Sequence, residues 1–155
     1  PGVYYAGTPE GGIWKTTSAG VTWFPIFDQI KGVDTIGAVQ VVPSDPNIVY
    51  AGTGDPTVIH PFLGSLGDGM WKSTNAGKTW QHIGLEDTVM IDSILVDPAN
   101  PNVVIVSALG NATHTVAVST APRMAAGPGP TSSSPPVITA RAKCVRQRRS
   151  QHHAG

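Results

Sequence analysis

The sequence predicts an all-β protein: a partial β-propeller made of four-stranded antiparallel blades, followed by an irregular C-terminal tail. Three observations support this fold class. The 155 residues include 18 Gly and 14 Pro, a content that favours short strands and turns over helices. Several short motifs occur twice within residues 1–110. Between them lie β-branched, apolar runs that end at Pro or Gly, as strands do.

The repeated motifs keep their order along the chain. The pairs are Tyr5–Thr8 with Tyr50–Thr53, Gly12–Lys15 with Gly69–Lys72, Thr16–Trp23 with Ser73–Trp80, and Ile36–Pro43 with Ile91–Pro98. A unit of about 55 residues with four short strands is typical of a propeller blade. We therefore expect a partial blade at 1–28, a complete blade at 34–84 and a partial blade at 90–110.

The complete unit predicts four strands. They are Ile36–Val42, Asn47–Thr53, Gly69–Ser73 and Thr79–Ile83. Pro43 ends the first, because proline cannot donate to a strand ladder. Asn75–Gly77 supplies the small residues that a tight hairpin requires between the last two strands.

One tryptophan follows each hairpin, Trp23 in the first unit and Trp80 in the second. Burial of each indole would remove about 150–250 Å² from water. We expect both to pack between neighbouring blades, and the alternative is a platform on which sugars stack.

The two octapeptides resemble the Asp-box, or BNR repeat, with the pattern Ser/Thr-x-Asp-x-Gly-x-Thr-Trp. The matching residues are Thr16, Gly20, Thr22 and Trp23 in the first, and Ser73, Gly77, Thr79 and Trp80 in the second. Ser18 and Asn75 stand at the Asp position. The resemblance implies that this side chain accepts backbone N–H groups inside the hairpin, which Ser and Asn can also do. Because neither is charged, we expect no metal there.

The order of the repeated motifs in residues 1–110 resembles that of bacterial sortilin-type propellers. Asp-box propellers include sialidases, xyloglucan-degrading glycosidases and sortilin-like receptors, so the resemblance implies the fold more than the chemistry. Our first expectation is a fragment of about two blades from a non-catalytic scaffold that binds a protein or polysaccharide. The alternative is part of a secreted glycoside hydrolase, xyloglucanase- or sialidase-like, with most of its active site elsewhere.

The resemblance also implies an extracellular or periplasmic location, no cofactor, and a partner in the remaining blades of a full-length chain. No run of about 20 apolar residues occurs, so we expect no membrane-spanning helix. Two blades cannot close a ring, and exposed edges favour association. We therefore expect the isolated chain to be marginally stable or to aggregate.

Ligand-binding residues are expected in one long loop. In the first unit only Pro9–Gly11 connects the second and third strands, whereas in the second unit residues 54–68 connect them. Long loops on rigid scaffolds concentrate binding residues. The candidates in this loop are Asp55, His60, Phe62 and Asp68. The alternative is a self-packed surface loop.

The residues favour no catalytic assignment. A glycosidase needs two carboxyl groups about 5–10 Å apart, and the available ones are Glu10, Asp55, Asp68, Glu86 and Asp87. Glu86 and Asp87 are weaker candidates, since they fit a solvated turn. Residues 1–110 contain no Arg, so a sialidase-like grip on a substrate carboxylate is not supported.

Residues 111–155 differ from the rest in charge. Residues 1–110 hold ten acidic and four basic residues, and residues 111–155 hold six basic and no acidic ones. Synonymous codons for Thr115–Pro130 can read RGGVYRTADGGRTWT in a shifted frame, which contains a complete Asp-box. We hypothesise that residues from about Asn111 onward arise from a frameshift, and we expect a disordered tail. The alternative is a basic tail that binds nucleic acid, but we do not expect nucleic acid as a partner.

Overall fold

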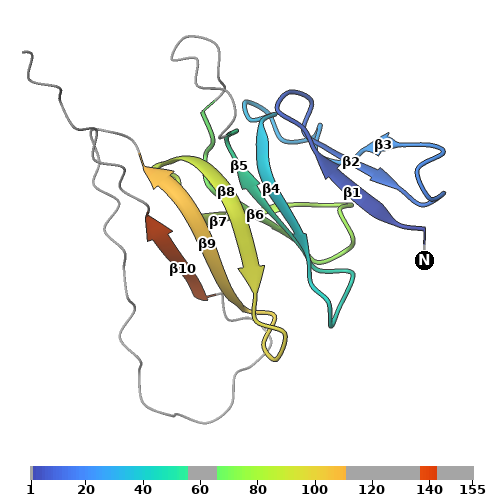
Figure 1. The fold of residues 1–155 in the computed structure, drawn as a ribbon. Coiled ribbons are helices and arrows are strands. Elements are labelled where there is room, and N and C mark those ends of the chain that lie inside the picture. Colours follow the sequence, from blue (N-terminus) through green and yellow to red (C-terminus); the bar gives the residue numbers. More distant parts are fainter. Residues whose placement is uncertain (1, 56–65, 111–136, 143–155) are drawn as a thin grey trace, which may run out of the picture.

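The computed structural model describes residues 2–55, 66–110 and 137–142. In these ranges the chain forms strands and no helix, and three sheets lie side by side in chain order (Figure 1). The first sheet holds β1 (Tyr4–Gly7), β2 (Ile13–Thr16) and β3 (Phe24–Pro25). The second holds β4 (Ile36–Val41), β5 (Val49–Thr53), β6 (Met70–Ser73) and β7 (Gln81–Gly84). The third holds β8 (Thr88–Val96), β9 (Val103–Gly110) and β10 (Val137–Ala142).

The second sheet is one complete antiparallel unit in the order β4-β5-β6-β7. Its strands agree within two residues with the four predicted from the sequence. The first sheet repeats its register, since Tyr5 pairs with Lys15 as Tyr50 pairs with Lys72. The all-β, partial propeller fold is therefore confirmed.

Both faces of the second sheet are covered, and β5 shows this most clearly. All five of its residues are buried, although successive side chains of a strand point to opposite faces. Tyr50 belongs to the cluster shared with the third sheet, and Ala51 to the cluster shared with the first. A sheet covered on both faces by similar sheets is the expected state of an inner propeller blade.

The two interfaces between sheets use equivalent residues. Tyr5, Ile13 and Ile26 pack against Ile36, Val39 and Ala51 between the first and second sheets. The sequence-equivalent residues between the second and third sheets are Tyr50, Met70 and Ile83, packed against Ile91, Ile94 and Val106. The sequence repeat is thus also a repeat of the contact between sheets.

The two hairpin turns share one hydrogen-bond pattern. Ser18 Oγ accepts the backbone N–H of Thr22 at 2.9 Å, and Asn75 Oδ1 accepts that of Thr79 at 2.9 Å. The hydroxyl oxygen of the first residue of each octapeptide accepts the backbone N–H of the glycine in the turn. Gly20 N–H donates to Thr16 Oγ1 at 3.0 Å, and Gly77 N–H donates to Ser73 Oγ at 2.9 Å. These side chains fix the turns that join the last two strands of the first and second sheets.

The two tryptophans that follow the turns lie in different surroundings. Trp80 donates its indole N–H to Ile26 O at 2.8 Å and packs edge-on against Phe27, in the segment that leaves the first sheet. Trp23 donates to Gly20 O in its own turn and is 38% exposed. The expectation of packing between blades is confirmed for Trp80 and wrong for Trp23 in this structure. The reason is that no described segment covers the outer face of the first sheet.

The third sheet departs from the repeat after β9. β8 and β9 are antiparallel, in the register that β4 and β5 use, whereas β10 pairs parallel with β9. Within the tail that the sequence analysis expects to be irregular, the structure describes one strand, β10. A β-branched run, Val137–Thr139, suits a strand, and the backbone edge of β9 offers it hydrogen-bond partners. The rest of 111–155 lies outside the described residues.

Candidate loop-edge site

The second sheet has a loop edge, which we define as residues 54–55, 66–69 and 85–87. β5 and β7 end at this edge, and β6 and β8 begin there. Because the strands alternate in direction, the hairpin turn at residues 74–80 lies at the opposite edge of the sheet. The loop edge therefore gathers polar side chains away from the two hairpin turns.

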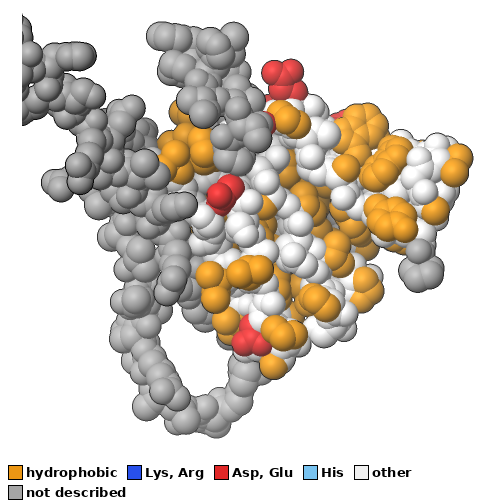
Figure 2. All heavy atoms as spheres, in the orientation of Figure 1, with side chains coloured by type: hydrophobic (Ala, Val, Ile, Leu, Met, Phe, Trp, Pro, Cys, Tyr) orange, Lys and Arg blue, Asp and Glu red, His pale blue; other side chains and the backbone are white. Residues whose placement is uncertain are grey.

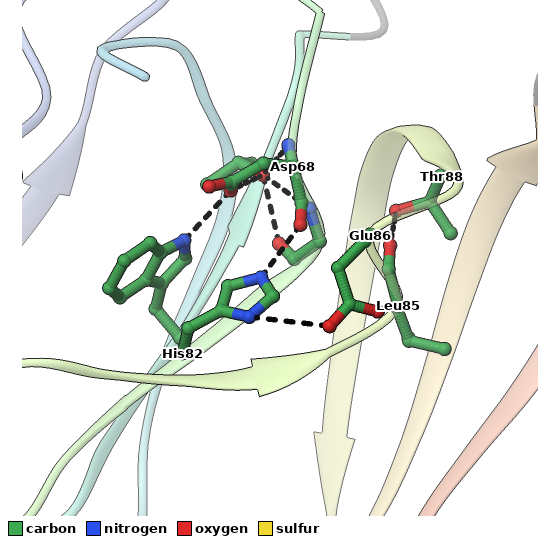
Figure 3. A network of polar contacts seen from close by, with 8 residues as sticks. Asp68, His82, Leu85, Glu86 and Thr88 are labelled. Carbon is green, nitrogen blue, oxygen red and sulfur yellow. Dashed lines mark hydrogen bonds and ion pairs between the residues drawn. The ribbon is translucent and has the colours of Figure 1, made fainter. Parts of the chain in front are cut away.

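Asp68 is the hub of this edge (Figure 3). Its Oδ1 accepts the indole N–H of Trp71 at 2.8 Å and the hydroxyl of Thr53 at 3.1 Å. The same Thr53 Oγ1 accepts the backbone N–H groups of Asp68 and Gly69, at 2.8 and 3.0 Å. Thr53 is fully buried and ends β5. These bonds fix the return of the long connection into β6.

His82 joins Asp68 to the next connection. Its Nε2 lies 2.7 Å from Asp68 O, and its Nδ1 lies 3.6 Å from Glu86 Oε1. A carbonyl oxygen only accepts, so Nε2 carries the hydrogen and Nδ1 faces the carboxylate. The ring also packs edge-on against Trp71, with centroids 4.9 Å apart. Figure 3 shows the imidazole between the Asp68 backbone and the Glu86 side chain.

Glu86 is the open end of this network. Its side chain is 70% exposed, whereas that of His82 is 27% exposed. An exposed carboxylate beside an imidazole of fixed orientation can accept hydrogen bonds from hydroxyl groups of a polar ligand. The loop edge thus combines the His82 imidazole, which is oriented by Asp68 O, with the Glu86 carboxylate, which reaches solvent.

The sequence-predicted ligand residues fare differently. Asp68 lies at the centre of the network, and Asp55 is buried at the end of β5 with an interaction of its own. His60 and Phe62 lie outside the described residues. The weaker candidate Glu86 contacts His82, while Asp87 is exposed in the same connection.

Three residues of the network were missed by the sequence analysis: Thr53, Trp71 and His82. One signal could have found His82. It pairs with Trp71 where the first sheet pairs Pro25 with Trp14, so the second unit places an imidazole where the first has a proline. A departure from an internal repeat at one strand position indicates a local role.

Other features of the described residues are weaker. A hollow is lined by Ile30, Gly32, Val33 and Asp34, in the connection from β3 to β4. The searched part of the chain contains no group of three His, Cys, Asp or Glu side chains that could hold a metal ion. In that same part, no helix is both long enough and apolar enough to cross a membrane.

Comparison with solved structures finds similar backbones. One is an ancestral GH74 enzyme, with a TM-score of 0.50 and 24% identity, matched over 65% of this chain and 11% of that chain. Another is the GH74 enzyme of Niastella koreensis, with a TM-score of 0.47 and 23% identity, matched over 74% of this chain and 19% of that chain. This chain thus spans a small part of either enzyme, and the first likeness supports the propeller fold. The scan of family models and the search of curated proteins gave no match.

Proposed function

We propose that this chain contributes blades to a β-propeller of the glycoside hydrolase kind, and that its loop edge faces a polysaccharide. The observation that carries this proposal is the exposed Glu86 carboxylate, whose Oε1 lies 3.6 Å from His82 Nδ1, next to the long connection after β5. Hydroxyl-rich ligands need such acceptors at fixed positions. The likeness to the ancestral GH74 enzyme supports the propeller fold on which this proposal depends.

A second candidate is a non-catalytic scaffold that binds a glycan or a protein. It is favoured by the state of Asp68, whose Oδ1 already accepts hydrogen bonds from Trp71 and Thr53. A carboxylate held in this way positions the connection. A general acid or base would instead have a carboxylate oxygen free to exchange a proton with the substrate. In this scheme the chain belongs to a scaffold that binds its ligand without cleaving it.

The two hairpin turns support membership of the Asp-box group, which we include in the proposal together with an extracellular or periplasmic location. Both turns use the side chain at the third position of the octapeptide, Ser18 or Asn75, to accept a backbone N–H four residues later. That is the role which the Asp of the pattern would have.

We further propose that the native sequence after about Asn111 is the shifted-frame reading. Its support is the direction of β10, which pairs parallel with β9, whereas β6 is antiparallel to β5 at the equivalent place in the second sheet. Resequencing the coding DNA tests this. Codons that cannot encode RGGVYRTADGGRTWT would overturn it, and this outcome leaves the proposal for the loop edge unaffected.

The function is tested by incubating the protein with xyloglucan and other β-glucans. Binding is measured by affinity electrophoresis, and cleavage by release of reducing ends. Release that disappears in Glu86→Gln supports the hydrolase; binding without release, weakened in Glu86→Gln and His82→Ala, supports the scaffold. Asp92→Asn is the matched control, since Asp92 is exposed on β8. If the protein shows no binding and no release, both candidates are overturned.

A further inference from the structure

His82 and Glu86 face each other through two atoms that can only accept a hydrogen bond. His82 Nε2 lies 2.7 Å from Asp68 O, so Nε2 carries the hydrogen of the neutral ring and Nδ1 has a lone pair. Glu86 Oε1 lies 3.6 Å from that Nδ1, which is too long for a hydrogen bond. A proton added at Nδ1 would turn the two acceptors into a donor and an acceptor of opposite charge.

The backbone beside the pair is fixed, whereas the Glu86 side chain reaches solvent. Leu85 has a φ of 67°, which is uncommon for a residue other than glycine, and it packs against the cluster between the second and third sheets. Leu85 O accepts both the backbone N–H and the hydroxyl of Thr88, at 3.0 and 2.7 Å. Figure 3 shows this turn beside the imidazole. Closing the gap to about 2.8 Å, the length of a charge-assisted hydrogen bond, thus needs only rotation of the Glu86 side chain.

The other charged groups around the imidazole do not compete for it. Asp68, in the connection before β6, has its Oδ1 engaged by two hydrogen bonds. Lys72 of β6 lies on the other face of the sheet from its neighbour in the strand, and its Nζ donates to a side chain in the turn of the third sheet. Asp87, in the same connection, and Asp28, in the segment that leaves the first sheet, are exposed. On the face drawn in Figure 2, acidic side chains reach the surface among the described residues, and no Lys or Arg side chain is visible. In the part of the chain that the structure describes, one carboxylate thus lies within ion-pair distance of the ring.

The fold itself does not require this pair, because the first unit lacks both groups. Pro25 pairs with Trp14 where His82 pairs with Trp71. Four residues after Pro25 stands Gln29, an uncharged amide. The first sheet therefore forms its equivalent strand with neither the imidazole nor the carboxylate. Both groups belong to the complete second sheet and the connection that leaves it.

We propose that His82 and Glu86 form a pH-sensitive switch on the ligand site of the loop edge, an inference that rests on the proposed function. Imidazoles take up a proton between about pH 8 and pH 5. Above this range the ring is neutral, and Glu86 offers its oxygens to hydroxyl groups of the polysaccharide. As pH falls, Nδ1 gains a proton from water and donates it to Oε1, which draws the carboxylate toward the ring. The ligand then loses an acceptor, so acidification weakens binding.

The closing step is tested without a ligand, by NMR of the 155-residue protein between pH 8 and pH 5.5. The ring ¹⁵N shifts of His82 report its protonation, and the Cδ shift of Glu86 reports its carboxylate. Both should change over the same pH interval. His82→Gln, whose amide can still donate to Asp68 O, should remove the Glu86 change, and the control His114→Gln should leave it. A Glu86 signal that does not follow the His82 ring, or that changes equally in His82→Gln, overturns the switch.

The effect on the ligand is tested with xyloglucan, by calorimetric titration at pH 8 and pH 5.5. The affinity should be about three- to tenfold lower at pH 5.5, which corresponds to the loss of one hydrogen bond. The affinity of His82→Gln should not depend on pH, and His114→Gln should keep the dependence of the unmodified protein. Backbone NMR spectra verify that both variants fold. Equal or tighter binding of the unmodified protein at pH 5.5 overturns the proposal.

The two measurements separate failure of the switch from failure of the proposed function. If xyloglucan binds at neither pH while the two NMR signals move together, the proposed function is overturned and the closing of the pair is supported. If xyloglucan binds equally at both pH values, the proposed ligand stands and its regulation by the pair is overturned.

Discussion

Gly52 lies so close to Ile91 of the neighbouring sheet that a Cβ on the glycine would stand 2.5 Å from Ile91 Cγ2. The first repeat has the same relationship, since a Cβ on Gly7 would stand 2.6 Å from Ile36 Cγ2. Each isoleucine is the residue at which the next sheet's inner strand packs onto the preceding sheet. The glycine of the Tyr-Ala-Gly-Thr motif is thus a packing requirement of the contact between sheets.

We therefore expect Gly52→Ala to lower the free energy of unfolding by about 1–3 kcal/mol, as overpacking does. Urea denaturation followed by circular dichroism measures it. Ser107→Ala is the matched control, because Ser107 is the equivalent residue on the third sheet and already carries a side chain. Its change should stay within about 0.5 kcal/mol. Equal effects of the two substitutions would contradict this account of the glycine.

Trp80→Ala should destabilise the protein more than Trp23→Ala. Trp80 is half-buried and donates to Ile26 O while packing on Phe27, so its removal leaves a cavity between two sheets. The expected cost is about 3–5 kcal/mol for Trp80 and about 1 kcal/mol for the exposed Trp23. The denaturation midpoints of the two variants measure the difference. A larger loss for Trp23 would show that its face is covered in solution.

Asn75→Ala should cost about 0.5–1.5 kcal/mol, because Thr79 N–H loses the acceptor that fixes the hairpin. Asn75→Asp should keep most of that stability. A carboxylate can accept the same N–H, and the Thr79 hydroxyl, which now accepts from Asn75 Nδ2 at 2.8 Å, can turn to donate instead. Thermal unfolding of the two variants at one pH measures the order. Asp being worse than Ala would refute this account of the turn.

Stability should fall at alkaline pH through Tyr50. Burial raises the pKa of Tyr50 from 10.0 to about 12, and its hydroxyl donates to Pro101 O at 2.9 Å. A raised pKa in the folded state favours the neutral phenol, so this stabilisation is present below pH 10 and is lost as pH rises from about 10 to about 12. The loss is on the order of 2 kcal/mol.

The control for this prediction is Tyr50→Phe, whose stability should show a smaller decrease over the same pH range. Lys72 stands over the Tyr50 ring, at 5.3 Å from its centroid, and burial lowers the pKa of Lys72. Its contribution has the opposite sign, since stability rises as pH passes upward through the lowered pKa. Both proteins contain Lys72, so the difference between their curves reports Tyr50. Identical curves would exclude the role of the phenol.

The strands were predictable because their signals are local. Alternating apolar residues, Pro43 after the first strand and the Asn75–Gly77 turn each act within a few residues. The register of the motifs gave the repeat, and the repeat gave the fold. The candidate site was only partly predictable. The long loop points to Asp68, but its partners Trp71 and His82 come from β6 and β7.

The sequence by itself determined the repeated unit, its four strands and the turns that join them. Only the tertiary structure decided which equivalent residues have different surroundings. Trp23 and Trp80 end two similar octapeptides, yet among the described residues only Trp80 has a neighbouring sheet to cover it. Likewise, only the fold shows that Gly52 must leave room for Ile91. The physical reason is that turn geometry depends on adjacent residues, whereas burial depends on surfaces brought together from distant parts of the chain.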